Sequence, residues 1–391
     1  DSPDAPACAA TQKVALEQAD GNFDLEKRTN QADANDPFAG PAKDEFSLCT
    51  EPWSANYRRD SLRAIKVSNI STPGPTMTAE IRYTEAWKDL YSLPAGDFGH
   101  FVAATGWDYN DDGVEDFLQG LPGVSRANLV SGKDGAVLRD YNGAGGLDRF
   151  GGAVAAGDIT GDGVPDYAIG AFEGAGAGGP FSNIAGRAYV FDGATGMFLW
   201  VALGTSNGDR LGAAVGILEG MGVLVGAPGM GEGGRVILYG PSGSEMNHWD
   251  GEGQDDSFGA TIAAMDFGNL GFAVGAPLYP GDFAMANSQR GKVYVYNDGG
   301  GLVGSVEGKH GAAQLGASIA YAGRIDRTGT ARPYLIAGSP QAFGDGEAYL
   351  IDLQAPAIVA TFEGESGKSR FGASVAGGTD VDGDMGPDLA V

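Results

Sequence analysis

A two-residue motif, Phe-Gly or Leu-Gly, returns about every 55 residues and limits the possible folds more than any other feature of this sequence. The copies are Phe98-Gly99, Phe150-Gly151, Leu211-Gly212, Phe258-Gly259, Leu315-Gly316 and Phe371-Gly372. Each copy leads into short apolar segments, for example Ala153–Ala156, Val223–Pro228, Lys292–Tyr296 and Ala357–Phe362. Four short antiparallel strands per unit are the plan of a propeller blade, so the repeat predicts an all-β chain.

Three nine-residue stretches within these repeats carry oxygen-bearing side chains at their first, third, fifth and ninth positions. They are Asp108, Asn110, Asp112 and Asp116; Asp158, Thr160, Asp162 and Asp166; and Asp380, Asp382, Asp384 and Asp388. Gly113 and Gly163 stand at the sixth position, where the chain turns tightly, while Met385 stands there in the third stretch. Calcium takes about 6–8 oxygen ligands, which a loop of alternating ligands and spacers can supply. The pattern therefore predicts about three Ca²⁺ sites.

Two other interpretations of these stretches are possible. An EF-hand loop needs a bidentate Glu at position 12 and a helix after it, but position 12 is Gln119, Ile169 or Val391. The apolar residues that follow favour a strand instead of a helix. Turns rich in Asp and Gly also form without any metal, and this alternative stays open.

Composition limits the class of protein. Glycine contributes 67 of 391 residues, which suits many turns between short strands. The formal net charge of −26 argues against nucleic acid or an anionic membrane as the partner. No apolar run is long enough for a transmembrane segment. We expect a secreted, extracellular or cell-surface protein.

Residues 1–90 differ from the rest and are expected to form a small β-sandwich-like domain. Its two cysteines, Cys8 and Cys49, would form one disulfide in a secreted chain, although two free thiols are the alternative. Two alternating segments on either side of Pro73-Gly74-Pro75 predict a hairpin between Ile65 and Ile81. The runs Q-A-D-G-N-F-D-L-E, D-A-N-D-P-F and I-K-V-S-N-I-S resemble the segment after the catalytic domain of immune-inhibitor-A-like secreted metallopeptidases, over residues of about 11–85. The zinc motif H-E-x-x-H of those enzymes occurs nowhere in the sequence.

Residues 91–391 resemble the FG-GAP repeat propellers of integrin α-subunit heads and many bacterial surface proteins. The resemblance rests on the repeated Phe-Gly, the Gly-Ala-Pro turns and the acidic stretches. It implies calcium binding by the acidic residues named above. It also implies that the seventh residue adds its backbone carbonyl, which assigns Val114, Val164 and Gly386. The repeats that open at Leu211, Phe258 and Leu315 lack the full acidic pattern and are expected to bind no metal.

Such propellers commonly close with seven blades, and seven units of this length need more residues than follow Phe98. The sequence supplies about five full repeats and the start of a sixth. We therefore expect an incomplete seven-bladed propeller, either a fragment of a longer chain or one that another chain completes.

No catalytic constellation accompanies these motifs. Gly204–Gly208 matches a G-x-S-x-G nucleophile motif around Ser206, but no helix is expected after it. The chain is accordingly predicted not to be an enzyme. The favoured function is a non-catalytic adhesion, binding or structural module with a protein or carbohydrate ligand. The alternatives are the accessory region of a secreted zinc metallopeptidase and a self-assembling subunit of an extracellular filament.

Overall fold

The computed structural model describes residues 101–391, apart from 145–147, 174–184, 268–269, 281–288, 327–330, 366–368 and 381–385, and the backbone of 63–68 and 80–85. The chain divides into two compact units, Asp1–Leu90 and Tyr91–Val391. In the described ranges, no helix is long and apolar enough to cross a membrane. The expected disulfide between Cys8 and Cys49 lies outside the described residues.

In the first unit, the described backbone forms a hairpin. Strand β1 (Arg63–Ser68) pairs in antiparallel register with β2 (Glu80–Glu85), so that Val67 lies opposite Ile81. The two strands flank the Pro-Gly-Pro segment, as the alternating sequence predicts.

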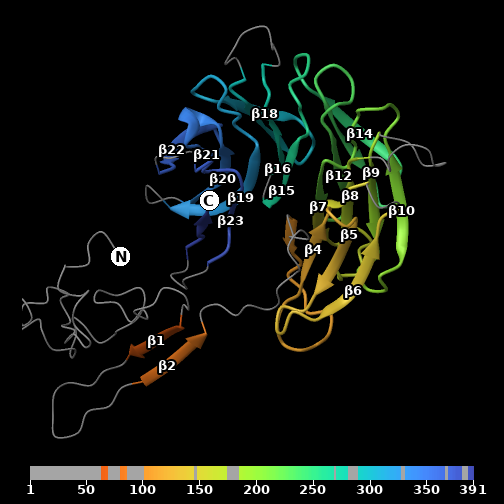
Figure 1. Cartoon of the computed structure of the whole chain (residues 1–391), viewed down its shortest axis with the longest axis vertical. Helices are drawn as coiled ribbons and strands as arrows, with labels where there is room; N and C mark the ends of the chain where they lie inside the picture. The colour runs from red at the N-terminus through yellow and green to blue at the C-terminus, as the bar shows by residue number, and fades with distance from the viewer. Residues whose placement is uncertain are drawn as a thin grey trace, which may run out of the picture. The chain divides into compact units, whose positions relative to one another are not determined.

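The described residues of the second unit contain five four-stranded antiparallel sheets, which follow one another in sequence order (Figure 1). Sheet 1 consists of β3 (Phe101–Ala104), β4 (Phe117–Leu121), β5 (Arg126–Val130) and β6 (Val137–Asn142). Sheet 2 consists of β7 (Phe150–Gly157), β8 (Asp166–Ala171), β9 (Arg187–Phe191) and β10 (Phe198–Leu203). Sheet 3 consists of β11 (Ala214–Leu218), β12 (Gly222–Ala227), β13 (Arg235–Tyr239) and β14 (Glu245–Asp250).

Sheet 4 consists of β15 (Thr261–Phe267), β16 (Leu270–Ala276), β17 (Lys292–Asn297) and β18 (Leu302–Glu307). Sheet 5 consists of β19 (Ser318–Asp326), β20 (Ala331–Ser339), β21 (Glu347–Asp352) and β22 (Ala357–Glu363). A short pair, β23 (Ala376–Gly377) and β24 (Leu389–Ala390), follows them.

Each four-stranded sheet is a simple meander, and burial changes across it. All six residues of β8 and of β12 are buried, whereas the fourth strand β14 is mostly exposed and half of β10 is exposed. A strand that is covered on both faces needs a continuous run of apolar or small residues, which explains sequences such as G-V-L-V-G-A in β12. The charged fourth strand E-M-N-H-W-D of β14 suits the exposed edge.

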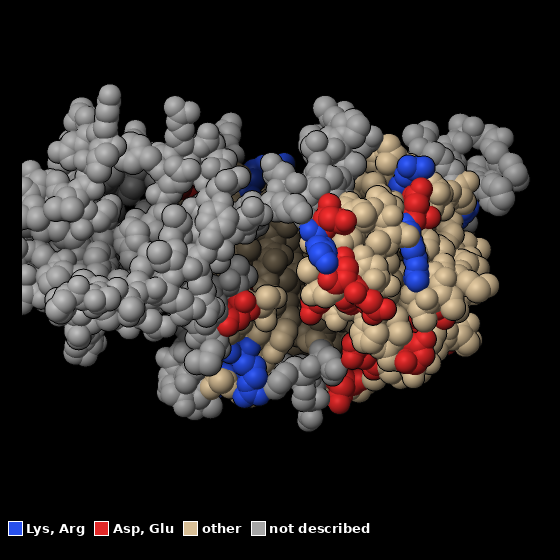
Figure 2. Space-filling model, turned by 90° about the horizontal axis from the view of Figure 1, so that it is seen from below, with Lys and Arg blue, Asp and Glu red and all other residues tan. Residues whose placement is uncertain are grey.

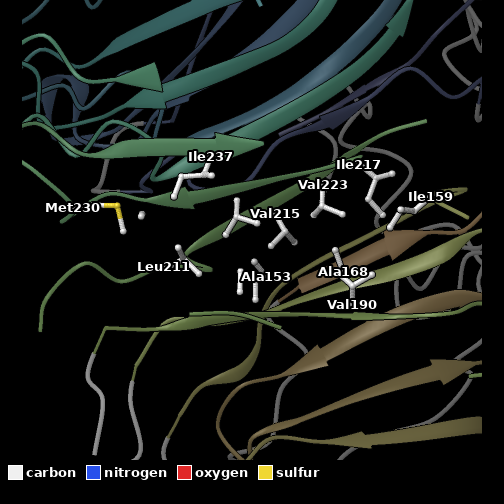
Figure 3. Close-up of a cluster of buried hydrophobic side chains, with 14 residues drawn as sticks. Ala153, Ile159, Ala168, Val190, Leu211, Val215, Ile217, Val223, Met230 and Ile237 are labelled. Atoms are coloured by element: carbon white, nitrogen blue, oxygen red, sulfur yellow. The ribbon is translucent and has the colours of Figure 1, made fainter. Parts of the chain in front are cut away.

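The hydrophobic core lies between consecutive sheets. One cluster joins sheets 2 and 3, where Ala168 and Val190 of sheet 2 face Ile217 and Val223 of sheet 3 (Figure 3). Similar clusters join sheets 1 and 2, 3 and 4, and 4 and 5. Face-to-face packing of successive small sheets is the arrangement of propeller blades.

Glycines let neighbouring sheets approach closely at the repeated Phe-Gly and Gly-Ala motifs. A Cβ on Gly226, which belongs to sheet 3, would lie 2.0 Å from the carbonyl oxygen of Gly259 in the next repeat. Gly259 itself has a φ of +87°, a conformation that strains other residues. Phe258 forms a parallel bridge with Gly234, which directly precedes β13 of sheet 3. The Phe-Gly and Gly-Ala motifs therefore recur together because the Phe-Gly of each repeat packs against the Gly-Ala of the repeat before it.

These observations confirm the all-β prediction and fit a propeller-like domain. They do not confirm the seven-bladed arrangement, and none of the sheets formed by the described strands is closed. In sheet 3 the acidic loop is replaced by the three-residue connection Glu219-Gly220-Met221 between β11 and β12. The expectation that this repeat binds no metal stays a prediction.

Candidate metal-binding loops

The acidic stretches lie between the first and second strands of their sheets. Loop 1 (residues 108–116) joins β3 to β4, and loop 2 (residues 158–166) joins β7 to β8. Loop 3 (residues 380–388) joins β23 to β24, but its Asp382 and Asp384 lie outside the described residues. A strand follows each loop, which is the expected difference from an EF-hand.

Loops 1 and 2 share the same hydrogen bonds from backbone amides to their carboxylates. The first-position carboxylate accepts from the amide of the sixth residue, and the fifth-position carboxylate accepts from the amide of the seventh. The donor and acceptor pairs are Gly113 to Asp108 (2.7 Å), Gly163 to Asp158 (2.9 Å), Val114 to Asp112 (3.0 Å) and Val164 to Asp162 (2.8 Å). Each loop is thus folded around its own acidic side chains.

The ninth-position carboxylates are buried, with exposed fractions of 2% for Asp116 and 0% for Asp166. Each accepts from the start of its own loop and from a glycine in the turn between the third and fourth strands. Asp116 accepts from the amides of Tyr109 (2.7 Å) and Gly132 (3.1 Å); Asp166 accepts from those of Ile159 (2.9 Å), Thr160 (2.9 Å) and Gly193 (2.8 Å). These two aspartates therefore tie the start of each loop to the turn between the third and fourth strands of its sheet.

Loop 1 also contacts a lysine that sequence reasoning missed. The ammonium of Lys133 donates to the backbone carbonyl of Asp112 (2.8 Å). The hydroxyl of Ser131 donates to the side-chain carboxylate of Asp112 (3.0 Å). Desolvation acts to raise the pKa of Asp112, but hydrogen bonds from Asn110, Val114 and Ser131 and the charge of Lys133 lower it. The signal in the sequence was the matching turns S-G-K-D-G and D-G-A-T-G, which place Ala194 where loop 1 has Lys133.

Loops 1 and 2 are also joined directly. The hydroxyl of Tyr109, the second residue of loop 1, donates to the carbonyl of Pro165, the eighth residue of loop 2 (2.6 Å). Burial raises the pKa of Tyr109 to about 12, so the hydroxyl keeps its proton at neutral pH. No local sequence pattern predicts this contact, because its two partners are 56 residues apart.

Loop 3 is described only at its ends. The amide of Asp388 donates to the carbonyl of Thr379 (2.8 Å), as the amide of Asp116 does to Trp107 in loop 1 (2.8 Å). Asp380 is exposed, and Gly386 and Asp388 are half-buried. The backbone at the two ends of loop 3 is thus closed in the same way as in loop 1.

The donor chemistry of loops 1 and 2 fits a hard cation such as calcium. Each offers three carboxylates, one amide or hydroxyl oxygen and the carbonyl of Val114 or Val164, and none offers sulfur or imidazole. Among the described residues, however, no three His, Cys, Asp or Glu side chains gather in an arrangement that could hold a metal ion. The carboxylates instead accept the loop amides, so these hydrogen bonds would compete with an ion. Figure 2 shows Asp and Glu side chains gathered in groups on one face, in keeping with the net charge of −26.

Comparison with known proteins gives a partial match. No model of a known protein family matches the chain. Integrin alpha-7 of Mus musculus is 33% identical over 158 residues, which cover 36% of this chain and 12% of that protein. Integrin alpha-7 of Rattus norvegicus (33% identity, 36% and 13% covered) and of Homo sapiens (32%, 36% and 12%) match similarly. The chain thus spans about an eighth of the length of these relatives.

A solved structure of a protein of unknown function from Bacteroides caccae aligns with a TM-score of 0.38 and 14% identity, over 67% of this chain and 71% of that chain. The expected resemblance to integrin α-subunits is supported over about a third of the chain. The expected resemblance of residues 11–85 to the secreted metallopeptidases is not supported by these matches.

Proposed function

We propose that residues 91–391 form a calcium-stabilised β-propeller that acts outside the cell as a non-catalytic module for binding a protein partner. The observation that carries the proposal is the 33% identity to integrin alpha-7 in a chain of successive four-stranded sheets. A propeller of the integrin type implies a binding role at a cell surface.

Calcium has a structural role in this proposal. Clustered carboxylates repel one another, and an ion that binds only the folded state stabilises that state by mass action. Loop 1 would use Asp108, Asn110, Asp112, Asp116 and the carbonyl of Val114; loop 2 would use Asp158, Thr160, Asp162, Asp166 and the carbonyl of Val164. Loop 3 would use Asp380, Asp382, Asp384, Asp388 and the carbonyl of Gly386.

Native mass spectrometry of the full chain tests the calcium part. We expect about three bound ions, and one fewer in each of the variants Asp112→Ala and Asp162→Ala. A chain that binds no calcium at millimolar concentration contradicts this part.

An array of extracellular proteins, probed with the full chain in calcium and in chelator, tests the binding part. We expect a saturable partner that is lost in chelator. A chain that binds calcium but no protein on the array contradicts the binding role alone.

A further inference from the structure

The tie between loop 1 and loop 2 begins at Tyr109, which both loops hold. Its backbone amide donates to Asp116 within loop 1 (2.7 Å), and its hydroxyl donates to the carbonyl of Pro165 in loop 2 (2.6 Å). Tyr109 follows the first ligand position of loop 1, and Pro165 precedes the last ligand position of loop 2. One side chain thus connects two candidate ion sites on different sheets.

The carbonyl of Pro165 also lies against the turn between β9 and β10. Gly193 packs so closely against it that a Cβ on residue 193 would lie 1.7 Å from the oxygen. The amide of Gly193 donates to Asp166 (2.8 Å), and Arg139 of β6 donates to the carbonyls of Gly193 (2.5 Å) and Ala194 (3.0 Å). Sheet 1 therefore holds loop 2 through both Tyr109 and Arg139.

The next pair of sheets lacks this polar tie. Ile159 occupies the second position of loop 2, is 3% exposed and packs in the apolar cluster between sheets 2 and 3. An isoleucine side chain cannot donate a hydrogen bond to the following loop. The amide of Gly220 does donate to the carbonyl of Asp158 (3.3 Å), but residues 219–221 form only a short turn. Among the described residues, the bond from Tyr109 to loop 2 therefore has no counterpart from Ile159 to residues 219–221.

We propose that Tyr109 couples the two loops, so that a calcium ion in one loop raises the affinity of the other. Ordering loop 1 around an ion fixes Tyr109, and Tyr109 fixes the carbonyl beside the last ligand of loop 2. The second ion then finds a loop that is already partly ordered, which lowers the entropic cost of its binding. Coupling of this kind is reciprocal, so loop 2 acts on loop 1 by the same factor. This inference rests on the proposed calcium function.

Terbium luminescence of the full chain gives a readout for loop 1 alone. Tb³⁺ is a hard cation that suits oxygen ligands, and Trp107 directly precedes the first ligand, Asp108. Selective excitation of tryptophan therefore reports an ion in loop 1. The variant Trp107→Phe abolishes this signal if the assignment is right.

The decisive experiment weakens loop 2 with Asp162→Asn and measures the terbium midpoint of loop 1. We expect the midpoint to rise about 2- to 10-fold, the range that one hydrogen bond supports. In the Tyr109→Phe background, which keeps the ring and removes the hydroxyl, Asp162→Asn should leave the midpoint unchanged. Tyr294→Phe is the matched control, because the hydroxyl of Tyr294 in sheet 4 is buried without a hydrogen-bond partner among the described residues. That background should keep the full shift.

Two results overturn the coupling while calcium binding stands. One is an equal shift with and without the Tyr109 hydroxyl, and the other is no shift in the otherwise wild-type chain. Failure of Tb³⁺ and of Ca²⁺ to bind at all is a different result, and it overturns the calcium function together with the coupling.

Discussion

Loop 1 and loop 2 reach the same hydrogen-bonded structure from different sequences. Loop 1 reads D-Y-N-D-D-G-V-E-D and loop 2 reads D-I-T-G-D-G-V-P-D, so they share only the first, fifth, sixth, seventh and ninth residues. These shared positions supply the carboxylates, the glycine with positive φ and the amides that they bind. The comparison teaches that these five positions are enough to set the loop, while the others adjust its charge and its neighbours.

The differences concern charge and stiffness. Loop 1 has two further acids, Asp111 and Glu115, and it has Lys133 beside it. Loop 2 has Gly161 and Pro165 at the matching positions, and Ala194 in place of the lysine. Asp111 adopts a φ of +56°, which is strained for a residue with a side chain, whereas Gly161 adopts +80° at no such cost. The backbone of loop 2 is therefore less strained than that of loop 1.

The largest expected effect tests what the loops share. Removal of calcium by a chelator should lower the free energy of unfolding by about 2.7 kcal/mol for each site that was saturated a hundred-fold above its Kd. Thermal unfolding with and without chelator measures this, and magnesium in place of calcium is the control. An unchanged melting temperature would argue that both loops are stable acidic turns without a metal.

The next effect separates the loops in the absence of calcium. Asp166→Ala leaves three backbone amides without their acceptor, so we expect a loss of about 3 kcal/mol in the free energy of unfolding. Asp116→Ala leaves two such amides and should cost about 2 kcal/mol. Denaturant unfolding in chelator measures both. Equal losses would show that the extra amide of loop 2 contributes nothing.

A smaller effect concerns the exposed fifth ligands. Asp162→Ala should remove more of the stabilisation by calcium than Asp112→Ala does, because Lys133 already offsets part of the charge in loop 1. The difference in melting temperature between calcium and chelator measures each loss. A larger loss for Asp112→Ala than for Asp162→Ala would contradict the expectation that calcium in loop 2 stabilises the fold more than calcium in loop 1.

The smallest effect exchanges the lysine between the loops. Lys133→Met should lower the calcium midpoint of loop 1 about 2- to 5-fold, because an exposed charge pair contributes little. Ala194→Lys should weaken loop 2 by a similar factor. Titration calorimetry measures both, and a salt concentration that screens charges should reduce the two changes together.

Much of the fold could be predicted from the sequence because its signals are local. The strands of sheets 2 to 5 lie where the repeated segments predict them, for example β13 at Arg235–Tyr239 and β22 at Ala357–Glu363. Most hydrogen bonds of the loops are equally local, since the carboxylates at positions 1, 5 and 9 accept from amides of their own loop. The bonds from Gly132 to Asp116 and from Gly193 to Asp166 are the exceptions. The number of blades was not predictable in this way, because it depends on how many sheets close a ring.

The sequence by itself determined the repeat, the strands and the acidic loops, because spacing and residue type act over short distances along the chain. Only the tertiary structure decided that Tyr109 reaches Pro165, that Lys133 sits beside Asp112 and that Gly226 lies against Gly259. These contacts arise when separate turns or successive sheets pack together, and packing brings together residues that no local pattern relates.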